Sequence, residues 1–130
     1  MGREHFFLRK GDLNCSSKFV VYRLVCKTCK MQYVGSTKTA FRLRFNNYKS
    51  HFRAFCDRRN KGTLNQGRVV PQVGLFQHFI QDGHNGMDDW DFQLIDKSDN
   101  EIQLRERESF WQYKLNTFLP VGLNDRNVPV

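Results

Sequence analysis

The chain has 130 residues, which is enough for one domain with a single core of modest size. Aromatic residues make up 14% of the sequence, and this excludes disorder for the body of the chain. The formal net charge of +8 favours a polyanionic partner, with nucleic acid ahead of an acidic membrane, although a basic soluble surface alone would also produce it.

The sequence carries no pattern typical of membrane insertion or secretion. No apolar run approaches the roughly 20 residues that a membrane-spanning helix needs, so we expect no membrane partner. The stretch from Met1 to Arg9 lacks the long apolar centre of a secretory signal. We therefore expect an intracellular, reducing compartment, in which the four cysteines form no disulfide and point first to metal binding or burial.

The first half of the chain predicts an arm followed by a pair of strands. Residues 1–16 are expected to form an N-terminal arm, because Lys-Gly-Asp at 10–12 breaks any long element, and residues 17–130 to form the folded domain. The run at 19–25 is rich in β-branched and aromatic residues, which favours a buried strand. A Cys-x-x-Cys turn then leads into a shorter strand at 31–35.

A helix is expected from about residue 40 to residue 56, capped by the threonines of Thr37-Lys38-Thr39. Arg44 lies about 60° from the start of its apolar stripe, whereas Arg42 lies about 100° away on the other side. Arg44 therefore borders the face that meets the sheet and is the favoured functional arginine, with Arg42 as the competitor. The apolar stripe consists of Phe41, Phe45, Tyr48, Phe52 and Phe55.

Residues 57–70 are predicted to form a long basic loop rich in glycine and asparagine. Long loops in compact domains are usually functional or disordered. Cations without interleaved aromatic residues suit phosphate contacts better than base stacking, and a solvated mobile loop is an equally good interpretation. The cations in question are Arg58, Arg59, Lys61 and Arg68.

The second half of the chain adds a strand between two helices. Pro71 is typical of a helix start, and a short helix is expected over 71–81. Alternating polar and apolar residues predict a third strand over 89–96. Ser98 and Glu101 have capping-box spacing and are expected to begin a last helix that ends near Phe118. Three strands flanked by helices define an α+β fold with a small antiparallel or mixed sheet.

Two tyrosines and one glutamate are candidates for chemistry. Tyr22 and Tyr33 lie near the middle of the two paired strands, and both phenols can project from one face of the sheet. Glu108 falls inside the apolar stripe of the last helix, where a carboxylate must be neutralised, paired or bound to a cation. An internal salt bridge to Arg44 is the purely structural alternative for Glu108.

The cysteine spacing indicates half of a zinc site. Cys26 and Cys29 form the ligand pair, and reduced thiols in a strand turn are the alternative interpretation. The remaining ligands would come from the histidines or, less favourably, from the other two cysteines. The candidates are His51, His78, His84, Cys15 and Cys56.

In this order and spacing, the motifs resemble a known family. Val20-Val21-Tyr22, Tyr33-Val34-Gly35, Arg44, Glu108 and Asn124 resemble the five-part signature of a GIY-YIG endonuclease domain. Two departures are visible: Val20 replaces a glycine, and Leu43 occupies the usual arginine position, so that Arg44 needs a one-residue insertion. The Cys-x-x-Cys between the tyrosine motifs resembles, more narrowly, the endonuclease of Penelope-like retroelements.

The resemblance implies an active site. It implies that Glu108 holds a catalytic Mg²⁺ (or Mn²⁺) and that Arg44 binds the scissile phosphate. Tyr22 is favoured as the general base with Tyr33 supporting it, and Asn124 supports the site by hydrogen bonds. A turn asparagine is the alternative for Asn124.

The resemblance also implies a closed structural zinc site formed by Cys26, Cys29, His78 and His84.

The activity implied by the resemblance is phosphodiester hydrolysis in DNA, with nicking of one strand of a retroelement's target to prime reverse transcription. It further implies a nuclear location and, as a partner besides DNA, the reverse transcriptase part of the same polyprotein. Two alternatives stay open: a non-catalytic, zinc-stabilised nucleic-acid-binding module, and a structure-specific repair nuclease.

Overall fold

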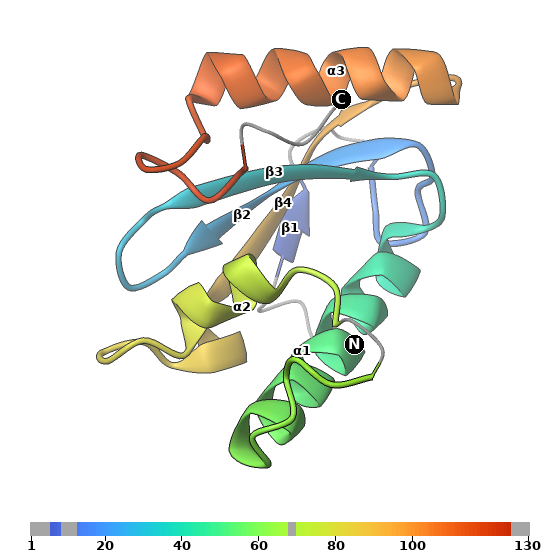
Figure 1. Cartoon of the computed structure of the whole chain (residues 1–130). Helices are drawn as coiled ribbons and strands as arrows, with labels where there is room; N and C mark the ends of the chain where they lie inside the picture. The colour runs from blue at the N-terminus through green and yellow to red at the C-terminus, as the bar shows by residue number, and fades with distance from the viewer. Residues whose placement is uncertain (1–5, 9–12, 68–69, 126–130) are drawn as a thin grey trace.

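The computed structural model describes residues 6–8, 13–67 and 70–125, and in it four strands form one sheet with helices on both faces (Figure 1). The order across the sheet is β1-β4-β2-β3. The strands are β1 (Phe6–Leu8), β2 (Val20–Cys26), β3 (Gln32–Thr37) and β4 (Trp90–Lys97). The helices are α1 (Phe41–Asn60), α2 (Val73–Phe79), the short 3-10 helix η2 (Gly86–Asp89) and α3 (Glu101–Leu115).

The predicted α+β class and the three predicted strands are confirmed. Strand β2 lies between β3 and β4 and is antiparallel to both. The fourth strand, β1, comes from the segment that we expected to be an arm, and it pairs in parallel with β4. Leu13, also in that segment, is buried in the core. The sheet is therefore mixed and one strand wider than predicted, and β3 is its outer strand opposite β1.

One face of the sheet is covered by α1 and α2 and is dominated by aromatic side chains (Figure 1). The predicted stripe of α1 is buried along its whole length. Its rings pack edge-on against the sheet: Phe45 and Phe92 lie 5.6 Å apart between ring centroids at 86°, and Phe52 and Trp90 lie 5.5 Å apart at 69°. Such edge-to-face pairs add about 0.5–1.5 kcal/mol each beyond the area they bury.

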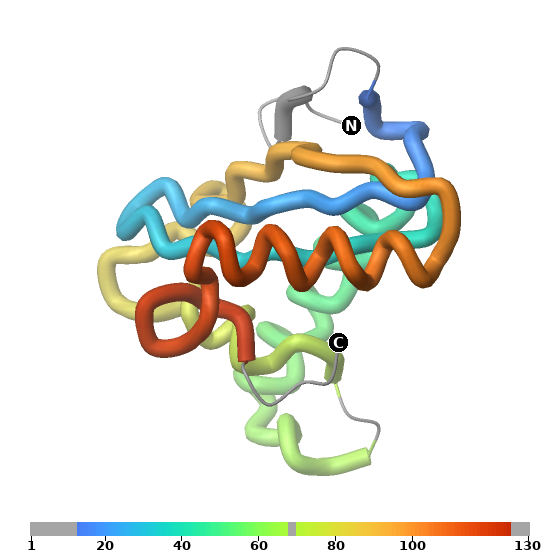
Figure 2. Tube along the Cα trace, turned by 90° about the horizontal axis from the view of Figure 1, so that it is seen from above, coloured from blue at the N-terminus to red at the C-terminus, as the bar shows by residue number. Residues whose placement is uncertain are grey.

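The other face is covered by α3, which runs along the edge strand β3 when the molecule is seen from above (Figure 2). Its apolar side packs on a small second core of aliphatic residues that point away from α1. That core consists of Val21, Val34, Ile95 and Leu104. Because the two helices cover opposite faces and both reach β3, residues from α1 and α3 meet at this edge.

The helix starts differ from the predicted caps. Ala40, not a threonine, precedes α1, and no side chain caps it. The first free amides of α1 donate instead to main-chain carbonyls, Arg42 to Cys15 at 2.7 Å and Phe41 to Ser17 at 3.2 Å. Helix α3 is capped by Asn100, whose side chain accepts from the amide of Gln103 at 2.9 Å, so the predicted box at Ser98 and Glu101 is wrong by two residues.

The ends of the helices also differ from the prediction. Helix α1 continues to Asn60, so the first four residues of the predicted basic loop are helical. Arg58 and Arg59 lie in its last turn, where cations are favoured by the helix dipole. Helix α3 ends at Leu115 rather than near Phe118. Among the described residues, no helix is both long enough and apolar enough to cross a membrane.

Candidate functional site

The two predicted tyrosines project from the same face of the sheet, as expected. In the β2–β3 register Tyr22 lies opposite Gly35 and Tyr33 lies opposite Leu24. Residues directly opposite each other on antiparallel strands point to the same face. Both phenols therefore lie on the α1 side of the sheet, close to the edge strand. Tyr22 is fully buried, whereas Tyr33 is half-buried.

Gly35 is required by the ring of Tyr22. A Cβ atom at residue 35 would lie 2.6 Å from the Tyr22 hydroxyl oxygen and 2.8 Å from the adjacent ring carbon. The ring is held from the other side by Phe41, with ring centroids 5.1 Å apart. The phenol therefore lies across the bare backbone of β3, and any side chain at residue 35 would displace it.

A third tyrosine, Tyr48, belongs to the same cluster, and the sequence did not identify it. Its hydroxyl lies 2.7 Å from the hydroxyl of Tyr22, so that one phenol donates to the other. Tyr48 is on the apolar stripe of α1, where burial in the core was a sufficient explanation. The available signal was a single hydroxyl in a stripe of phenylalanines, one helical turn after Arg44.

The phenols are held in the protonated form. Burial, followed by the neighbouring Tyr33, raises the pKa of Tyr22 far above its ordinary value. The neighbouring Tyr48, together with burial and Glu108, raises the pKa of Tyr33 well above 10.0. Burial and the phenol of Tyr22 raise the pKa of Tyr48 in the same direction. Arg44 opposes these shifts at Tyr22 and Tyr48, which places its charge beside the pair.

Arg44 lies at the site as predicted, and Arg42 does not. Arg42 is exposed, whereas Arg44 is half-buried and donates from Nη2 to the carbonyl oxygen of Ser36 at 3.4 Å. The Nε of Arg44 is buried without a hydrogen-bond partner. A buried guanidinium N–H without an acceptor is costly unless a ligand supplies one.

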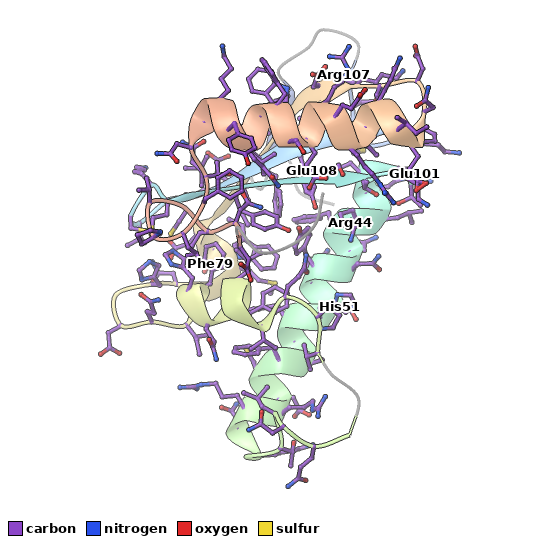
Figure 3. All side chains as sticks on the ribbon, turned by 45° about the horizontal axis from the view of Figure 1, so that its top comes forward. Arg44, His51, Phe79, Glu101, Arg107 and Glu108 are labelled. Carbon is purple, nitrogen blue, oxygen red and sulfur yellow. The ribbon has the colours of Figure 1, made fainter. Side chains whose placement is uncertain are left out.

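Glu108 reaches the same edge from the opposite face of the sheet. Its Oε1 accepts a hydrogen bond from the Ser36 hydroxyl at 2.9 Å, so the carboxylate lies against β3 (Figure 3). Burial raises the pKa of Glu108, and the Ser36 hydroxyl and the charge of Arg44 only partly offset it. In the described part of the chain no ion pair joins Glu108 to Arg44, so the salt-bridge alternative is not supported.

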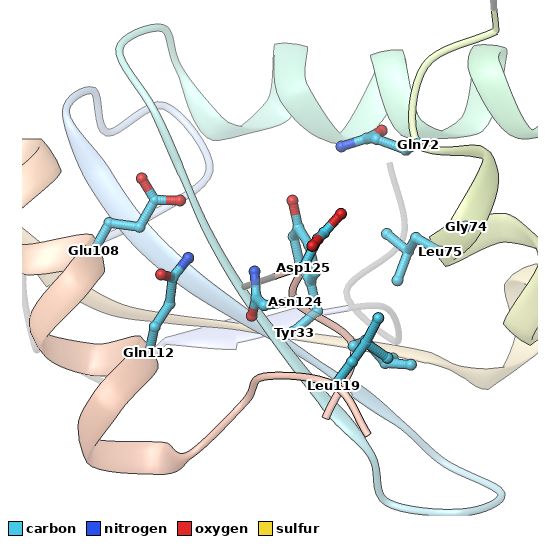
Figure 4. Close-up of a pocket in the computed structure, with 10 residues that line it drawn as sticks. Tyr33, Gln72, Gly74, Leu75, Glu108, Gln112, Leu119, Asn124 and Asp125 are labelled. Carbon is cyan, nitrogen blue, oxygen red and sulfur yellow. The ribbon is translucent and has the colours of Figure 1, made fainter. Parts of the chain in front are cut away.

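A cleft of about 370 Å³ opens beside these groups (Figure 4). Glu108 and Gln112 border it from α3, and Gln72 and Leu75 from the start of α2. Tyr33 lies between them, as do residues of the segment after α3. The hydroxyl of Tyr33 and an acid that forms no salt bridge within the described residues therefore border one cleft.

The side chain of Asn124 makes hydrogen bonds that hold the segment after α3 against β3. Its Oδ1 accepts from the amide of Val34 at 2.8 Å and from the hydroxyl of Thr117 at 2.6 Å. Its Nδ2 donates to the carbonyl of Val34 at 2.9 Å. The side chain thus fastens the segment after α3 to β3, one residue from Tyr33. The turn alternative for Asn124 does not account for these hydrogen bonds to β3.

Four side chains gather into a possible metal site at the far end of the β2–β3 turn. The ligand atoms of Cys26, Cys29, His78 and His84 all lie within 4.8 Å of one another. Cys29 Sγ and His78 Nε2 are 3.3 Å apart, and the two buried ring nitrogens of His84 have the Cys29 thiol as their neighbour. Two sulfurs and two imidazoles fit a tetrahedral metal, whose ligand atoms stand about 3.3–3.8 Å apart at bonds of 2.0–2.3 Å.

The other metal-ligand candidates lie outside this cluster. His51 is half-buried on α1, and Cys15 and Cys56 are partly buried free thiols packed against the aromatic core. The cations expected to contact phosphate differ in their exposure and hydrogen bonding. Arg42, Arg59 and Lys61 are exposed, Arg58 donates to the carbonyl of Thr63 at 2.9 Å, and Arg68 lies outside the described residues.

The fold and these side chains define a small α+β domain with tyrosines, an arginine and a glutamate gathered at the edge of its sheet. The chain belongs to the GIY-YIG catalytic domain family, whose model matches residues 18–124. This confirms the broader of the two resemblances and supports nuclease activity.

One solved structure is similar to the chain, the "Structure of the Catalytic Domain of Homing Endonuclease I-TevI". The identity is 22%, the TM-score is 0.55, and the match covers 83% of this chain and 98% of that chain. At this identity the likeness establishes the fold. A comparison with curated proteins found no match.

Proposed function

We propose that this chain is a metal-dependent DNA endonuclease that hydrolyses a phosphodiester bond at the β3 edge. The observation that carries the proposal is the position of Glu108, which forms no salt bridge within the described residues and borders two hollows. It shares one hollow with Tyr33 and the other with Arg44, whose buried Nε has no hydrogen-bond partner. A pure binding module has no use for an acid without a cationic partner facing its phosphate groove. The similarity to a homing endonuclease's catalytic domain favours the same reaction.

The donor set at Glu108 fits a hard divalent cation. The carboxylate is partly buried, it is hydrogen-bonded to only one neutral hydroxyl in the described structure, and it borders a cleft with room for water and phosphate. Mg²⁺ is commonly held by one or two carboxylates, with the remaining positions filled by water and substrate phosphate. A bound Mg²⁺ (or Mn²⁺) would supply positive charge that activates water and lowers the pKa of nearby phenols.

The chain's own residues then have distinct tasks. Arg44 donates two hydrogen bonds to the scissile phosphate, one of them from its free Nε. Tyr33, which faces the cleft, holds the attacking water by its hydroxyl. Tyr22 remains the proposed base, a role that requires the bound cation and Arg44 to lower its raised pKa, so that it is ionised when it takes the proton from the water. Asn124 keeps β3 in place through Val34.

The narrower proposal is a nuclease of the Penelope-like retroelement type. It is supported by the Cys-x-x-Cys between the tyrosine motifs and by the cluster that both cysteines form with His78 and His84. In that cluster we propose a structural Zn²⁺ that holds the β2–β3 turn against the end of α2. One set of site residues per chain supports nicking, which would expose a 3′ hydroxyl for reverse transcription. A nuclear location and association with the element's reverse transcriptase follow as parts of this proposal.

The test is incubation of supercoiled plasmid with the full chain in Mg²⁺ or in EDTA. Open-circular product is expected only with Mg²⁺. Glu108→Ala should abolish nicking while keeping DNA binding, and Arg44→Ala should slow it at least about 100-fold, far more than Arg42→Ala. Normal nicking by Glu108→Ala would refute the metal assignment. Binding without nicking by the wild type, in either buffer, would favour the non-catalytic module.

A further inference from the structure

The segment after α3 carries three consecutive apolar residues at its tip. Leu119 is 53% exposed and Val121 is 63% exposed, with the exposed Pro120 between them. Single apolar residues on a surface need no explanation, but an exposed run of three is unfavourable in water unless it has a function.

Main-chain hydrogen bonds at the base of this tip, which consists of residues 119–121, hold it in place. The amide of Leu119 donates to the carbonyl of Asn124 at 2.9 Å, and the amide of Gly122 donates to the carbonyl of Phe118 at 2.8 Å. Gly122 admits no other residue, because a Cβ atom there would lie 2.2 Å from the carbonyl oxygen of Thr117. The apolar residues are thus presented by a fixed backbone.

The base is fastened beside the candidate active site. The amide of Leu123 donates to the carbonyl of Gln32 at 2.8 Å, and the side chain of Asn124 bonds both main-chain groups of Val34. These anchors are the two neighbours of Tyr33 on β3. Leu119 itself lines the cleft that Glu108 borders (Figure 4). A duplex with one phosphate in that cleft must therefore pass the tip.

We propose that Leu119, Pro120 and Val121 form a wedge that enters the minor groove of bound DNA and opens a base step next to the scissile phosphate. The proposal rests on the proposed function of the cleft. Apolar side chains of this kind unstack base steps and kink the duplex by about 20–90°. A tip of three residues suits a minor groove about 6 Å wide. It is far smaller than the roughly 800 Å² per partner of a stable protein interface.

The wedge predicts a substrate preference that needs no base-specific hydrogen bond. Opening a step costs a few kcal/mol at ordinary steps and less at pyrimidine–purine steps such as TA and CA, which are easily unstacked. The enzyme should therefore favour a TA or CA step beside the cut over a stiff A-tract by about tenfold. A mismatched base pair is already partly unstacked, so a duplex with a mismatch at that step should be cleaved without help from the wedge.

The test uses the full chain with the substitution Glu108→Gln in EDTA, so that binding is seen without cleavage. The probe is a duplex with 2-aminopurine at the TA step, whose fluorescence rises when the base unstacks. Val121→Ser and Leu119→Ser, added singly and together, should remove most of the rise at saturating protein. Ile102→Ser is the matched control, because Ile102 is 74% exposed on α3 and lies about 20 Å along the helix from its end.

Cleavage in Mg²⁺ by chains with intact Glu108 gives the second readout. The double variant should lose the preference for the TA step and should regain the wild-type rate on a duplex mismatched there. An unchanged fluorescence rise and an unchanged preference in the double variant would overturn the wedge. Unstacking without cleavage by the wild type would refute the nuclease and leave the wedge. No rise in fluorescence with Glu108→Gln alone would refute the wedge whether or not the wild type cleaves.

Discussion

At the scale of single residues, Glu108 occupies a position that destabilises the folded state when its carboxyl is ionised. A carboxylate that is partly buried needs a cation or several donors, and in the described structure it has one hydroxyl, from Ser36, and the more distant charges of Arg44 and Arg105. The result is a raised pKa. Residues that destabilise the folded state in this way cluster at functional sites, because the missing partner is the ligand.

The raised pKa of Glu108 predicts the sign of a pH effect. An acid whose pKa is higher in the folded than in the unfolded chain holds its proton more tightly when folded, so stability falls as pH rises from the ordinary value of 4.5 through the folded value. Glu108→Gln removes this loss and keeps an oxygen for the Ser36 hydroxyl. In EDTA, the variant should melt at a higher temperature than the wild type at pH 7, and the difference should shrink towards pH 4.

Thermal melts between pH 4 and pH 8 check this prediction. Glu106→Gln is the matched control, because Glu106 is exposed two residues earlier on the same helix and should give nearly the same melting temperature as the wild type across the range. If Glu108→Gln melts lower than the wild type at pH 7, then the carboxylate stabilises the fold, and the argument that it lacks a partner is wrong.

At the scale of elements, the helices and strands that have a strong periodic pattern were predicted correctly. Features that depend on contacts between distant parts of the chain were not. The α1 stripe and the anomaly of Glu108 within the α3 stripe follow from 3.6-residue periodicity alone. The start of α1 was predicted within one residue, but its capping was not, because its amides bond to carbonyls of Cys15 and Ser17, which are distant in sequence. Strand β1 was missed for the same reason: three residues carry no readable period, and their partner β4 lies more than eighty residues away.

The same limit applies to the site. Tyr22, Tyr33 and Arg44 could be placed on one side of the sheet from strand alternation and helix angle. Tyr48 could not be distinguished from a core residue, because only the distance between its hydroxyl and that of Tyr22 assigns it to the cluster. The cysteine pair of the Cys/His cluster was predicted from its spacing, and the complete set of four residues was implied by the resemblance. The structure brings the four together.

Removal of the proposed zinc should destabilise the place where the β2–β3 turn meets α2. The Cys/His cluster joins the turn after β2 to α2 and the residues that follow it, next to the hydrogen bond from the Thr28 hydroxyl to Asp89. Cys29→Ser should abolish bound zinc and lower the melting temperature by about 10 °C, since structural zinc contributes directly to folding in small domains. Elemental analysis and thermal melts measure both effects. Cys56→Ser, at a thiol outside the cluster, is the control and should retain one zinc per chain. Native protein free of zinc would contradict the prediction.

At the scale of the whole molecule, the site lies where two layers share one edge. Helix α1 covers one face of the sheet and α3 the other (Figures 1 and 2). On the edge strand β3, Ser36 is reached from both helices: its carbonyl accepts from Arg44 of α1, and its hydroxyl donates to Glu108 of α3. Exposed cations stand on α1 at both ends, Arg42 near its start and Arg59 near its end. With a net charge of +8, this arrangement favours a duplex lying along α1 and past β3.

This orientation predicts how binding depends on salt. Each phosphate contact that is lost should lower the slope of log K against log salt by about 0.9, so Arg42→Ala and Arg59→Ala should each flatten it by that amount. Arg58→Ala should mainly lower thermal stability, because Arg58 bonds the carbonyls of Thr63 and Leu64 that follow the helix. Binding of a labelled duplex in EDTA from 50 to 200 mM salt, roughly the range over which such contacts are resolved, gives the slopes. Lys97→Ala, at an exposed cation on β4, is the control. If Lys97→Ala flattens the slope and the two α1 variants do not, then the duplex lies across β4, away from the cleft that Glu108 and Tyr33 border.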